Sequence, residues 1–176
     1  MKVCIMNSDL HDFFCRSYSL EHTKRYSMVP VIHPESVATH SFFVALGVLL
    51  LRNTYKFDVQ KAALIALCHD LAEMDISDVN HLVKKTYPAV AKALQDAEEQ
   101  IIKGFPDEVR PYCEMYGDHS VEAMIVHYAD AFQCAQYATN ELGMGNTGYM
   151  EDVLKNSNRR MRELELKLQP YGIEND

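Results

Sequence analysis

Basic residues are scarce in this sequence of 176 residues: 17 Lys and Arg stand against 25 Asp and Glu, and the formal net charge is −8. A surface with this average charge repels the phosphates of nucleic acids and the headgroups of anionic membranes. We therefore expect neither a nucleic-acid polymer nor a membrane as a partner. A small anionic substrate held by a metal ion remains compatible with the composition.

Long apolar runs and alternating patterns are also missing. The apolar stretch Val44–Leu51 is interrupted by Gly47 and is far shorter than the about 20 residues that span a bilayer. Residues 1–14 lack a basic region followed by a clean apolar core, so we expect no signal peptide. No segment shows the period of two that is typical of a half-buried strand, which disfavours a β fold.

Paired cysteines are absent as well. The chain has an odd number of cysteines, they are widely scattered, and no C-x-x-C occurs among them: Cys4, Cys15, Cys68, Cys113 and Cys134. This pattern suggests neither a disulfide framework nor a zinc ribbon. We expect a reducing setting and a cytoplasmic location.

Apolar residues recur at three- and four-residue spacings, which predicts an all-α fold. The length and a hydrophobic content of 48% suit a single domain over residues 1–176. We expect helices over residues 8–22, 35–52, 58–74, 87–104, 106–116, 119–142 and 149–168. Asp58 is the expected N-cap of the third range, Gly104 with Pro106 ends the fourth, and residues 24–33 and 75–85 are expected to be loops.

Polar residues in apolar helical contexts are the strongest functional signal. His40 lies among apolar residues, His69 and Asp70 follow the apolar run AALIALC, and Asp130 interrupts the stretch VHYADAFQCA. A buried charge without a partner is destabilising by several kcal/mol, so Asp130 needs a cation or donors nearby. Two imidazoles and two carboxylates from separate segments would form one divalent-metal site with open positions for water and substrate.

Each of these residues also has an ordinary interpretation. A single histidine such as His40 on an apolar face is often a hydrogen-bonded core residue. Asp130 by itself would be satisfied by a salt bridge to Arg159 or Arg160. The pair His11-Asp12, on a normal amphipathic helix, shows that the dipeptide alone proves little. The combination of all the candidate ligands favours a metal site.

Three motifs make the pattern more specific: E-S-V-A-x-H-S around His40, H-D-x-x-E-x-x-x-x-D from His69, and Y-A-D-A-F around Asp130. With these motifs in this order, the chain resembles the HD-domain phosphohydrolases, and most of all the small YfbR-like 5'-deoxynucleotidases. The similarity covers roughly residues 24–141. It implies a helical bundle of about six or seven helices and hydrolysis of (deoxy)nucleoside 5'-monophosphates to nucleoside and phosphate.

The resemblance also implies roles for individual residues. A divalent metal ion, either cobalt, manganese or another first-row ion, would be held by His40, His69, Asp70 and Asp130. Glu73 matches the catalytic glutamate that orients or deprotonates the attacking water, and its i+4 spacing from His69 puts both on one helix face. Asp78 matches a second catalytic acid that contacts the sugar or assists the leaving 5'-oxygen.

Substrate-binding residues follow from the same resemblance, with departures. Arg25 and Lys84 match residues that hold the phosphate. Tyr26 stands where the family often has a tryptophan that closes against the deoxyribose, so the resemblance does not carry over a strict selectivity for deoxyribose. His127 stands where the family commonly has a lysine. Its side chain can still reach the phosphate, but its charge would depend on pH. The family often has a proline after the second acid. Here the segment is Asp78-Val79-Asn80, without a proline, so this loop is expected to have a different shape.

Three alternatives remain open. A deoxynucleoside triphosphate triphosphohydrolase of the small phage type would use Arg25, Lys84 and His127 for a longer phosphate chain. A two-metal phosphodiesterase would need His119 and His127 as extra ligands. A catalytically inactive HD domain would only bind nucleotides or a partner protein. The resemblance also implies a homo-oligomer, commonly a dimer and in phage-type relatives a larger ring.

Overall fold

A computed structural model of the chain describes residues 7–79 and 81–173, and within these ranges all regular secondary structure is helical. This confirms the all-α prediction. The α-helices are α1 (Ser8–Ser17), α2 (Ser19–His22), α3 (Val37–Leu50), α4 (Val59–Cys68), α5 (Glu73–Ile76), α6 (His81–Thr86), α7 (Pro88–Lys103), α8 (Arg110–Met115), α9 (Val121–Gly143) and α10 (Tyr149–Leu168). Two short 3₁₀ helices are η1 (Leu51–Asn53) and η2 (Gln169–Tyr171). Cys4 and Asn80 lie outside the described residues.

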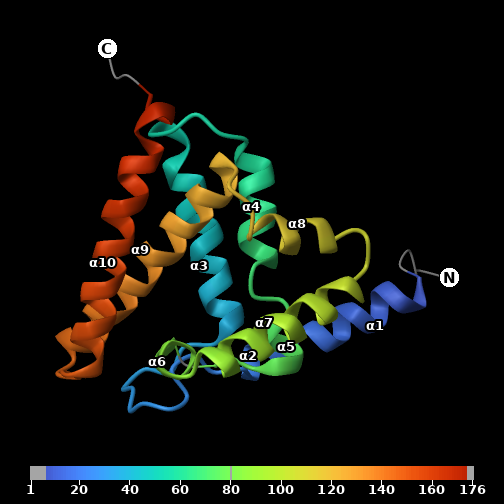
Figure 1. Cartoon of the computed structure of the whole chain (residues 1–176), viewed down its shortest axis with the longest axis horizontal. Helices are drawn as coiled ribbons and strands as arrows, with labels where there is room; N and C mark the ends of the chain where they lie inside the picture. The colour runs from blue at the N-terminus through green and yellow to red at the C-terminus, as the bar shows by residue number, and fades with distance from the viewer. Residues whose placement is uncertain (1–6, 80, 174–176) are drawn as a thin grey trace, which may run out of the picture.

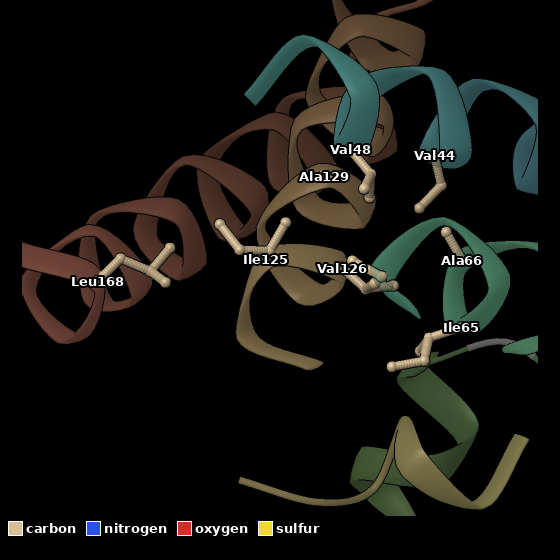
Figure 2. Packing of buried hydrophobic residues seen from close by; sticks show 9 residues of the cluster. Val44, Val48, Ile65, Ala66, Ile125, Val126, Ala129 and Leu168 are labelled. Carbon is tan, nitrogen blue, oxygen red and sulfur yellow. The ribbon is translucent and has the colours of Figure 1, made fainter. Parts of the chain in front are cut away.

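The centre of the molecule is a bundle of α3, α4, α9 and α10 (Figure 1). The long helices α9 and α10 run side by side, and α1 with α7 extends to the other side of the bundle (Figure 1). Valine, isoleucine, leucine and alanine side chains from the four bundle helices meet in a fully buried core: Val44, Val48, Ala62, Ile65, Ala66, Ile125, Val126, Ala129 and Leu168 (Figure 2). Within the described residues, no helix is long and apolar enough to cross a membrane.

The α3 and α9 helices approach each other closely at Gly47. A Cβ atom added to this glycine would lie 3.3 Å from the Cβ of Ala129. The two small residues therefore allow the backbones to come together one residue before Asp130. This contact fixes the distance between α3, which carries His40, and α9, which carries Asp130.

Three bundle helices begin at side-chain caps. Ser36 accepts a hydrogen bond from the backbone N–H of Thr39 at the start of α3, and Ser120 does the same for α9. Asp58 caps α4 through the N–H of Lys61, as predicted. These caps satisfy N–H groups that the first helical turn leaves without partners, and they place the functional helices in register.

The predicted helix over residues 58–74 is wrong in its second half, because α4 ends at Cys68. The ring Nδ1 of His69 donates to the carbonyl of Ala66, and the thiol of Cys113 donates to the carbonyl of Cys68. Backbone bonds over the next residues then span three positions, from Glu73 N–H to the carbonyl of Asp70 for example. Side-chain donors therefore occupy backbone carbonyls of the last helical turn, and the following backbone hydrogen bonds form turns of the 3₁₀ type instead of continuing the α-helix.

Other boundaries also differ from the sequence prediction. The segment 75–85, expected to be a loop, includes the end of α5 and most of α6. The range 8–22 is divided at Tyr18 into α1 and α2, and the range 106–116 holds only the six-residue helix α8. The remaining ranges agree with α3, α7, α9 and α10 to within two residues at each end.

Candidate metal centre and its cavity

The four predicted ligands come together from three parts of the chain: His40 in α3, His69 and Asp70 after α4, and Asp130 in α9. The Nε2 atoms of the two histidines are 3.3 Å apart. Asp130 Oδ1 lies 3.4 Å from His40 Nε2, and Asp70 Oδ2 lies 3.1 Å from His69 Nε2. Ligand atoms of His40, His69 and Asp130 all lie within 4.8 Å of one another, a spacing that fits one shared cation.

Each imidazole is oriented by its other ring nitrogen. His40 Nδ1 donates to Gln133 Oε1 at 2.7 Å, and the amide of Gln133 donates in turn to Glu35 Oε1 at 2.5 Å. His69 Nδ1 donates to the carbonyl of Ala66 at 2.8 Å. With the proton on Nδ1, Nε2 keeps its lone pair and points into the centre. Metal-ligating histidines are typically held in this way.

Asp130 is divided between two sets of contacts. Its Oδ1 faces His40, whereas its Oδ2 accepts from Arg160 Nη1 at 2.8 Å and from the Tyr116 hydroxyl at 3.1 Å. The salt bridge to Arg160, which the sequence offered as an ordinary explanation, is therefore present in addition to the ligand geometry. Because the two oxygens have different partners, the salt bridge does not prevent Oδ1 from binding a cation.

The electrostatics of the centre favour positive charge. Burial lowers the pKa of His69, but the carboxylate of Asp70 outweighs it and raises the pKa to about 9. Burial raises the pKa of Asp130, but its contacts with His40 and Arg160 hold it well below its usual range. Without a metal, this group of carboxylates retains a proton on an imidazole. The donor set fits a divalent cation that would take the place of that proton.

The metal centre opens into a cavity of about 870 Å³. Two of its buried polar atoms, Arg25 Nη1 and Glu73 Oε2, have no hydrogen-bond partner among residues 7–79 and 81–173. Since buried polar groups are normally satisfied, these atoms are available to a ligand. Predicted site residues on the cavity wall are Arg25, Tyr26, His69, Asp70, Glu73, Asp78, Lys84 and Asp130.

Glu73 begins α5, one turn beyond the ligand pair. Burial, together with the negative charges of Asp70 and Asp78, raises the pKa of Glu73 to about 8. A carboxyl group with this pKa can take up and release a proton near neutral pH. Asp78 lies nearby, and its Oδ2 accepts from the backbone N–H of Tyr26 at 3.2 Å, which joins the two loops that border the cavity.

Tyr26 adopts a strained backbone conformation with φ of 56°. Its ring stacks on Tyr137 with centroids 5.1 Å apart, and the guanidinium of Arg25 lies 5.6 Å from the Tyr26 ring centroid. Left-handed backbone at an aromatic residue persists only where surrounding contacts hold it. Here the contacts with Asp78 and Tyr137 hold it, so both side chains of the Arg25-Tyr26 pair border the cavity.

Two predicted site residues, His40 and His127, do not line the cavity; His40 lies behind it among the candidate ligands, whereas His127 lies apart from them. The Nδ1 of His127 accepts a hydrogen bond from Arg160 Nη2 at 2.9 Å, and the centroid of its ring lies 4.3 Å from the centroid of the Tyr116 ring. Burial and the charge of Arg160 lower the pKa of His127 to about 4, so it is neutral near pH 7. Arg160, on the cavity wall, occupies the place where a cation was expected from His127.

Sequence reasoning missed several residues that support the centre: Glu35, Tyr116, Gln133, Cys134 and Arg160 as a neighbour of His127. Gln133 had a signal in the sequence, since it is a polar residue in an apolar helix one turn after Asp130. Tyr116 carried none, because it contacts Asp130 from another segment, and the sequence offered Arg160 only beside Arg159 as a salt-bridge partner of Asp130.

Comparison with known proteins places this geometry in a family. The HD domain family matches residues 18–167, which is most of the chain, and the chain therefore belongs to it. The protein is an HD-domain phosphohydrolase, an enzyme that depends on a divalent metal ion.

Among curated proteins, the chain is 28% identical over 149 residues to the 5'-deoxynucleotidase VP0926 of Vibrio parahaemolyticus, covering 76% of each chain. It is 26% identical over 152 residues to the 5'-deoxynucleotidase yfbR of Photorhabdus temperata, covering 78% of this chain and 77% of that protein. These relatives agree with the YfbR-like resemblance of the sequence motifs.

Solved structures show the same fold. The PH0347 protein of Pyrococcus horikoshii has a TM-score of 0.77 and 26% identity, with 91% of this chain and 94% of that chain covered. A cyanophage S-2L HD phosphohydrolase bound to dA and one catalytic Zn²⁺ ion has a TM-score of 0.64 and 18% identity, with 98% and 90% covered. At that identity the cyanophage protein supports the fold alone.

Proposed function

We propose that the chain hydrolyses (deoxy)nucleoside 5'-monophosphates to a nucleoside and phosphate. The observation that carries the proposal concerns Arg25 Nη1 and Glu73 Oε2, which are buried and without a partner in the described part of the chain. Both residues border the same cavity as His69, Asp70 and Asp130. A phosphate ester suits this arrangement, because it offers oxygens to a guanidinium and a phosphorus atom to a water beside a carboxylate. The names of the 5'-deoxynucleotidase relatives support the same substrate class.

In this proposal, His40, His69, Asp70 and Asp130 hold the divalent ion. A bound ion would supply positive charge that lowers the pKa of a water from about 15.7 toward about 7. Glu73 orients this water and accepts its proton as the water oxygen attacks phosphorus and the bond to the 5'-oxygen breaks. The proton then passes from Glu73 to the 5'-oxygen, which leaves as the hydroxyl of the nucleoside. The raised pKa of Glu73 suits a group that must later release that proton.

Arg25 and Lys84 bind the phosphate oxygens. Arg25 reaches the cavity from a short bridge between Lys24 and Ser36, and Glu35 Oε2 lies 4.0 Å from its Nε. Glu35 also holds Gln133, so one carboxylate positions both the arginine and the partner of His40. Asp78 contacts the sugar, and Tyr26 closes against the deoxyribose. His127 acts by orienting Arg160, not by touching the phosphate.

A deoxynucleoside triphosphate triphosphohydrolase is the second candidate. The cavity favours it in one respect, since it gathers six of the 17 basic residues of the chain: Arg25, Lys84, Lys85, Lys155, Arg159 and Arg160. A two-metal phosphodiesterase is less well supported. His119 is exposed and His127 is bonded to Arg160, and neither belongs to the ligand group found among the described residues.

The test is a substrate panel with added cobalt or manganese. Deoxyribo- and ribonucleoside mono-, di- and triphosphates are incubated with the full chain, and the products are identified by chromatography. Nucleoside and phosphate from the monophosphates support the proposal, whereas inorganic triphosphate supports the second candidate. If metal is bound but no nucleotide is hydrolysed, the result supports the third alternative, an inactive HD domain that only binds nucleotides. The ratio of deoxy to ribo turnover measures how well Tyr26 excludes a 2'-hydroxyl.

We also propose that the enzyme acts in the cytoplasm as a homo-oligomer, a dimer or a larger ring. Among the described cysteines, Cys15, Cys68, Cys113 and Cys134 are all free, which supports a reducing compartment. Large apolar side chains on the surface support association with another copy.

A further inference from the structure

Two buried side chains, Glu35 and Gln133, lie between the arginine of the cavity and the metal centre. Glu35 Oε2 lies 4.0 Å from Arg25 Nε, and Glu35 Oε1 accepts a hydrogen bond from Gln133 Nε2 at 2.5 Å. Gln133 Oε1 accepts in turn from His40 Nδ1 at 2.7 Å. Glu35 is 7% exposed, Gln133 is 8% exposed and His40 is fully buried. We call Glu35 and Gln133 the buried link, because three successive polar contacts join Arg25 to His40 through them.

The buried link is satisfied in one orientation. The amide oxygen of Gln133 faces the N–H of His40, and its NH₂ group faces the carboxylate of Glu35. The opposite orientation would set the amide oxygen against that carboxylate. At the other end, the backbone N–H of Arg25 donates to the carbonyl of Glu35 at 3.0 Å. Because a buried polar network resists displacement of its members, the position of Arg25 is tied to that of His40.

The two ends of the link face the two ligands of the proposed reaction. Arg25 Nη1 is buried beside the cavity, without a hydrogen-bond partner in the described part of the chain. His40 Nε2 lies 3.4 Å from Asp130 Oδ1 within the candidate ligand group. The described residues that line the cavity include neither Glu35 nor Gln133. An effect of the link on a phosphate in the cavity must therefore pass through Arg25.

We propose that Glu35 and Gln133 are positioning residues that couple phosphate binding at Arg25 to metal binding at His40. The inference rests on the proposed function and deepens it, since each ligand would order side chains that the other ligand needs. A second ligand then loses less conformational entropy, which makes the two bind cooperatively. A phosphate and a cation in one cavity also attract each other directly, so the contribution of the link is measured with each ligand alone.

The experiment uses titration calorimetry on the full chain, with inorganic phosphate after metal depletion and with cobalt in the absence of phosphate. Gln133→Leu should weaken cobalt binding by about 10-fold, because His40 loses its acceptor. It should also weaken phosphate binding by about 3-fold, although it changes no charge and no residue of the cavity wall. Gln136→Leu is the matched control, since Gln136 is an exposed glutamine of the same helix, and both affinities should stay unchanged.

Glu35→Gln separates positioning from simple charge. The new amide oxygen can still accept from Gln133, but the negative charge beside Arg25 is lost. Coulomb attraction alone predicts stronger phosphate binding after this change. We expect the opposite, a weakening by about 3-fold, because the guanidinium is no longer held in place. With saturating cobalt and a nucleoside monophosphate, KM should rise more than kcat falls, a split that a general loss of stability would not produce.

Stronger phosphate binding by Glu35→Gln overturns the proposal, as does an unchanged phosphate affinity in both link variants. Equal losses in Gln136→Leu would show a general effect of substitutions in α9, with the same consequence. A second route from Arg25 to the metal centre runs through the Cys134 thiol, which accepts from Arg25 Nη2 at 3.4 Å and lies 3.5 Å from Asp130 Oδ1. If Cys134→Ala weakens both ligands and Gln133→Leu does not, the coupling belongs to that thiol and the proposal is wrong.

The metal-depleted wild type must itself bind phosphate. If it binds none up to about 10 mM, Arg25 is not held ready by the link, and the proposal fails. Circular dichroism checks that each variant keeps its helices, and if Gln133→Leu does not fold, the sign of the Glu35→Gln effect decides. The binding measurements need no hydrolysis. A chain that hydrolyses no nucleotide would therefore refute the proposed function without deciding this test.

Discussion

At the scale of single residues, the centre depends on side chains that each satisfy two demands. The imidazoles of His40 and His69 donate through Nδ1, which fixes their orientation and leaves Nε2 directed at the proposed cation site. Asp130 uses Oδ2 for Arg160 and Tyr116 and keeps Oδ1 for the same centre. Such division holds ligands in place before the ion arrives, which is what a preorganised site requires.

Arg160→Met should weaken metal binding by about 10-fold, because Asp130 loses the donor that fixes its orientation. Arg159→Met is a matched control, since that neighbouring arginine is 73% exposed and lies 4.0 Å from Glu163 instead. Titration calorimetry with cobalt or manganese measures both variants. Equal affinities would show that Arg160 does not position Asp130, and Arg160→Lys should recover part of the loss.

Glu73→Gln should lower turnover by about 100-fold or more, because the amide cannot accept the proton of water. The same substitution should stabilise the metal-free chain at high pH. The carboxyl pKa is raised from 4.5 to about 8 on folding, so its protonated form favours the folded state at low pH. That contribution is fully present below about pH 4.5 and is lost as the pH rises toward about 8.

Thermal unfolding in the presence of a chelator measures this effect. At about pH 8.5, Glu73→Gln should raise Tm by about 8–16 °C, corresponding to a gain on the order of 4 kcal/mol. At about pH 4, where wild-type Glu73 is protonated in both states, the two proteins should unfold at similar temperatures. A gain of the same size at both pH values would point to packing instead of titration.

At the scale of elements, the loop that carries Arg25 and Tyr26 is attached to α9 through a buried carboxylate. Glu141 is fully buried and accepts from the N–H groups of Ile32 and His33 at 2.8 and 2.7 Å, and from the Asn146 amide at 2.6 Å. Burial raises the pKa of Glu141, but these donors outweigh it and lower the pKa overall. One side chain thus joins the start of the bundle to the end of α9.

Glu141→Gln should destabilise the protein by about 2–4 kcal/mol. The glutamine would replace one carboxylate oxygen by an amide NH₂ group, which cannot accept the hydrogen bonds that Ile32 and His33 now donate. The loop should also become less ordered, so KM should rise more than kcat falls. Glu151→Gln, at the exposed start of α10, is the control and should leave both unchanged. Denaturant unfolding and steady-state kinetics measure the two effects. An unchanged KM would show that the order of this loop does not affect substrate binding.

Periodicity predicted the long helices well, because α7, α9 and α10 each have a regular apolar stripe and clear ends. It failed after Cys68, where the sequence still looked helical. At the break, the Cys113 thiol from α8 donates to the carbonyl of Cys68, a contact between distant segments that periodicity does not show. That His40, His69, Asp70 and Asp130 lie close together was predictable from buried polar residues and motifs. The choice of Arg160 over Arg159 as the partner of Asp130 was not, because a contact between α9 and α10 leaves no periodic signal.

At the scale of the whole molecule, the metal centre connects the helices of the bundle. His40 belongs to α3, His69 and Asp70 follow α4, Asp130 belongs to α9, and Arg160 reaches Asp130 from α10. A cation held by the ligands proposed here would bind only when these segments are assembled. Binding to the folded chain alone raises its stability by mass action.

Cobalt or manganese at about 100 times its dissociation constant should therefore stabilise the fold by about 2.7 kcal/mol, which raises Tm by about 5–11 °C. Thermal unfolding with metal and with a chelator measures the difference. Asp70→Asn should abolish most of the shift, because the ligand loses its charge at the centre of the assembly. Asp75→Asn should retain it, since Asp75 pairs with Arg16 at the surface, 3.4 Å away. An equal rise in Tm in both variants would mean that the ion binds elsewhere, and that metal binding at this centre does not stabilise the bundle.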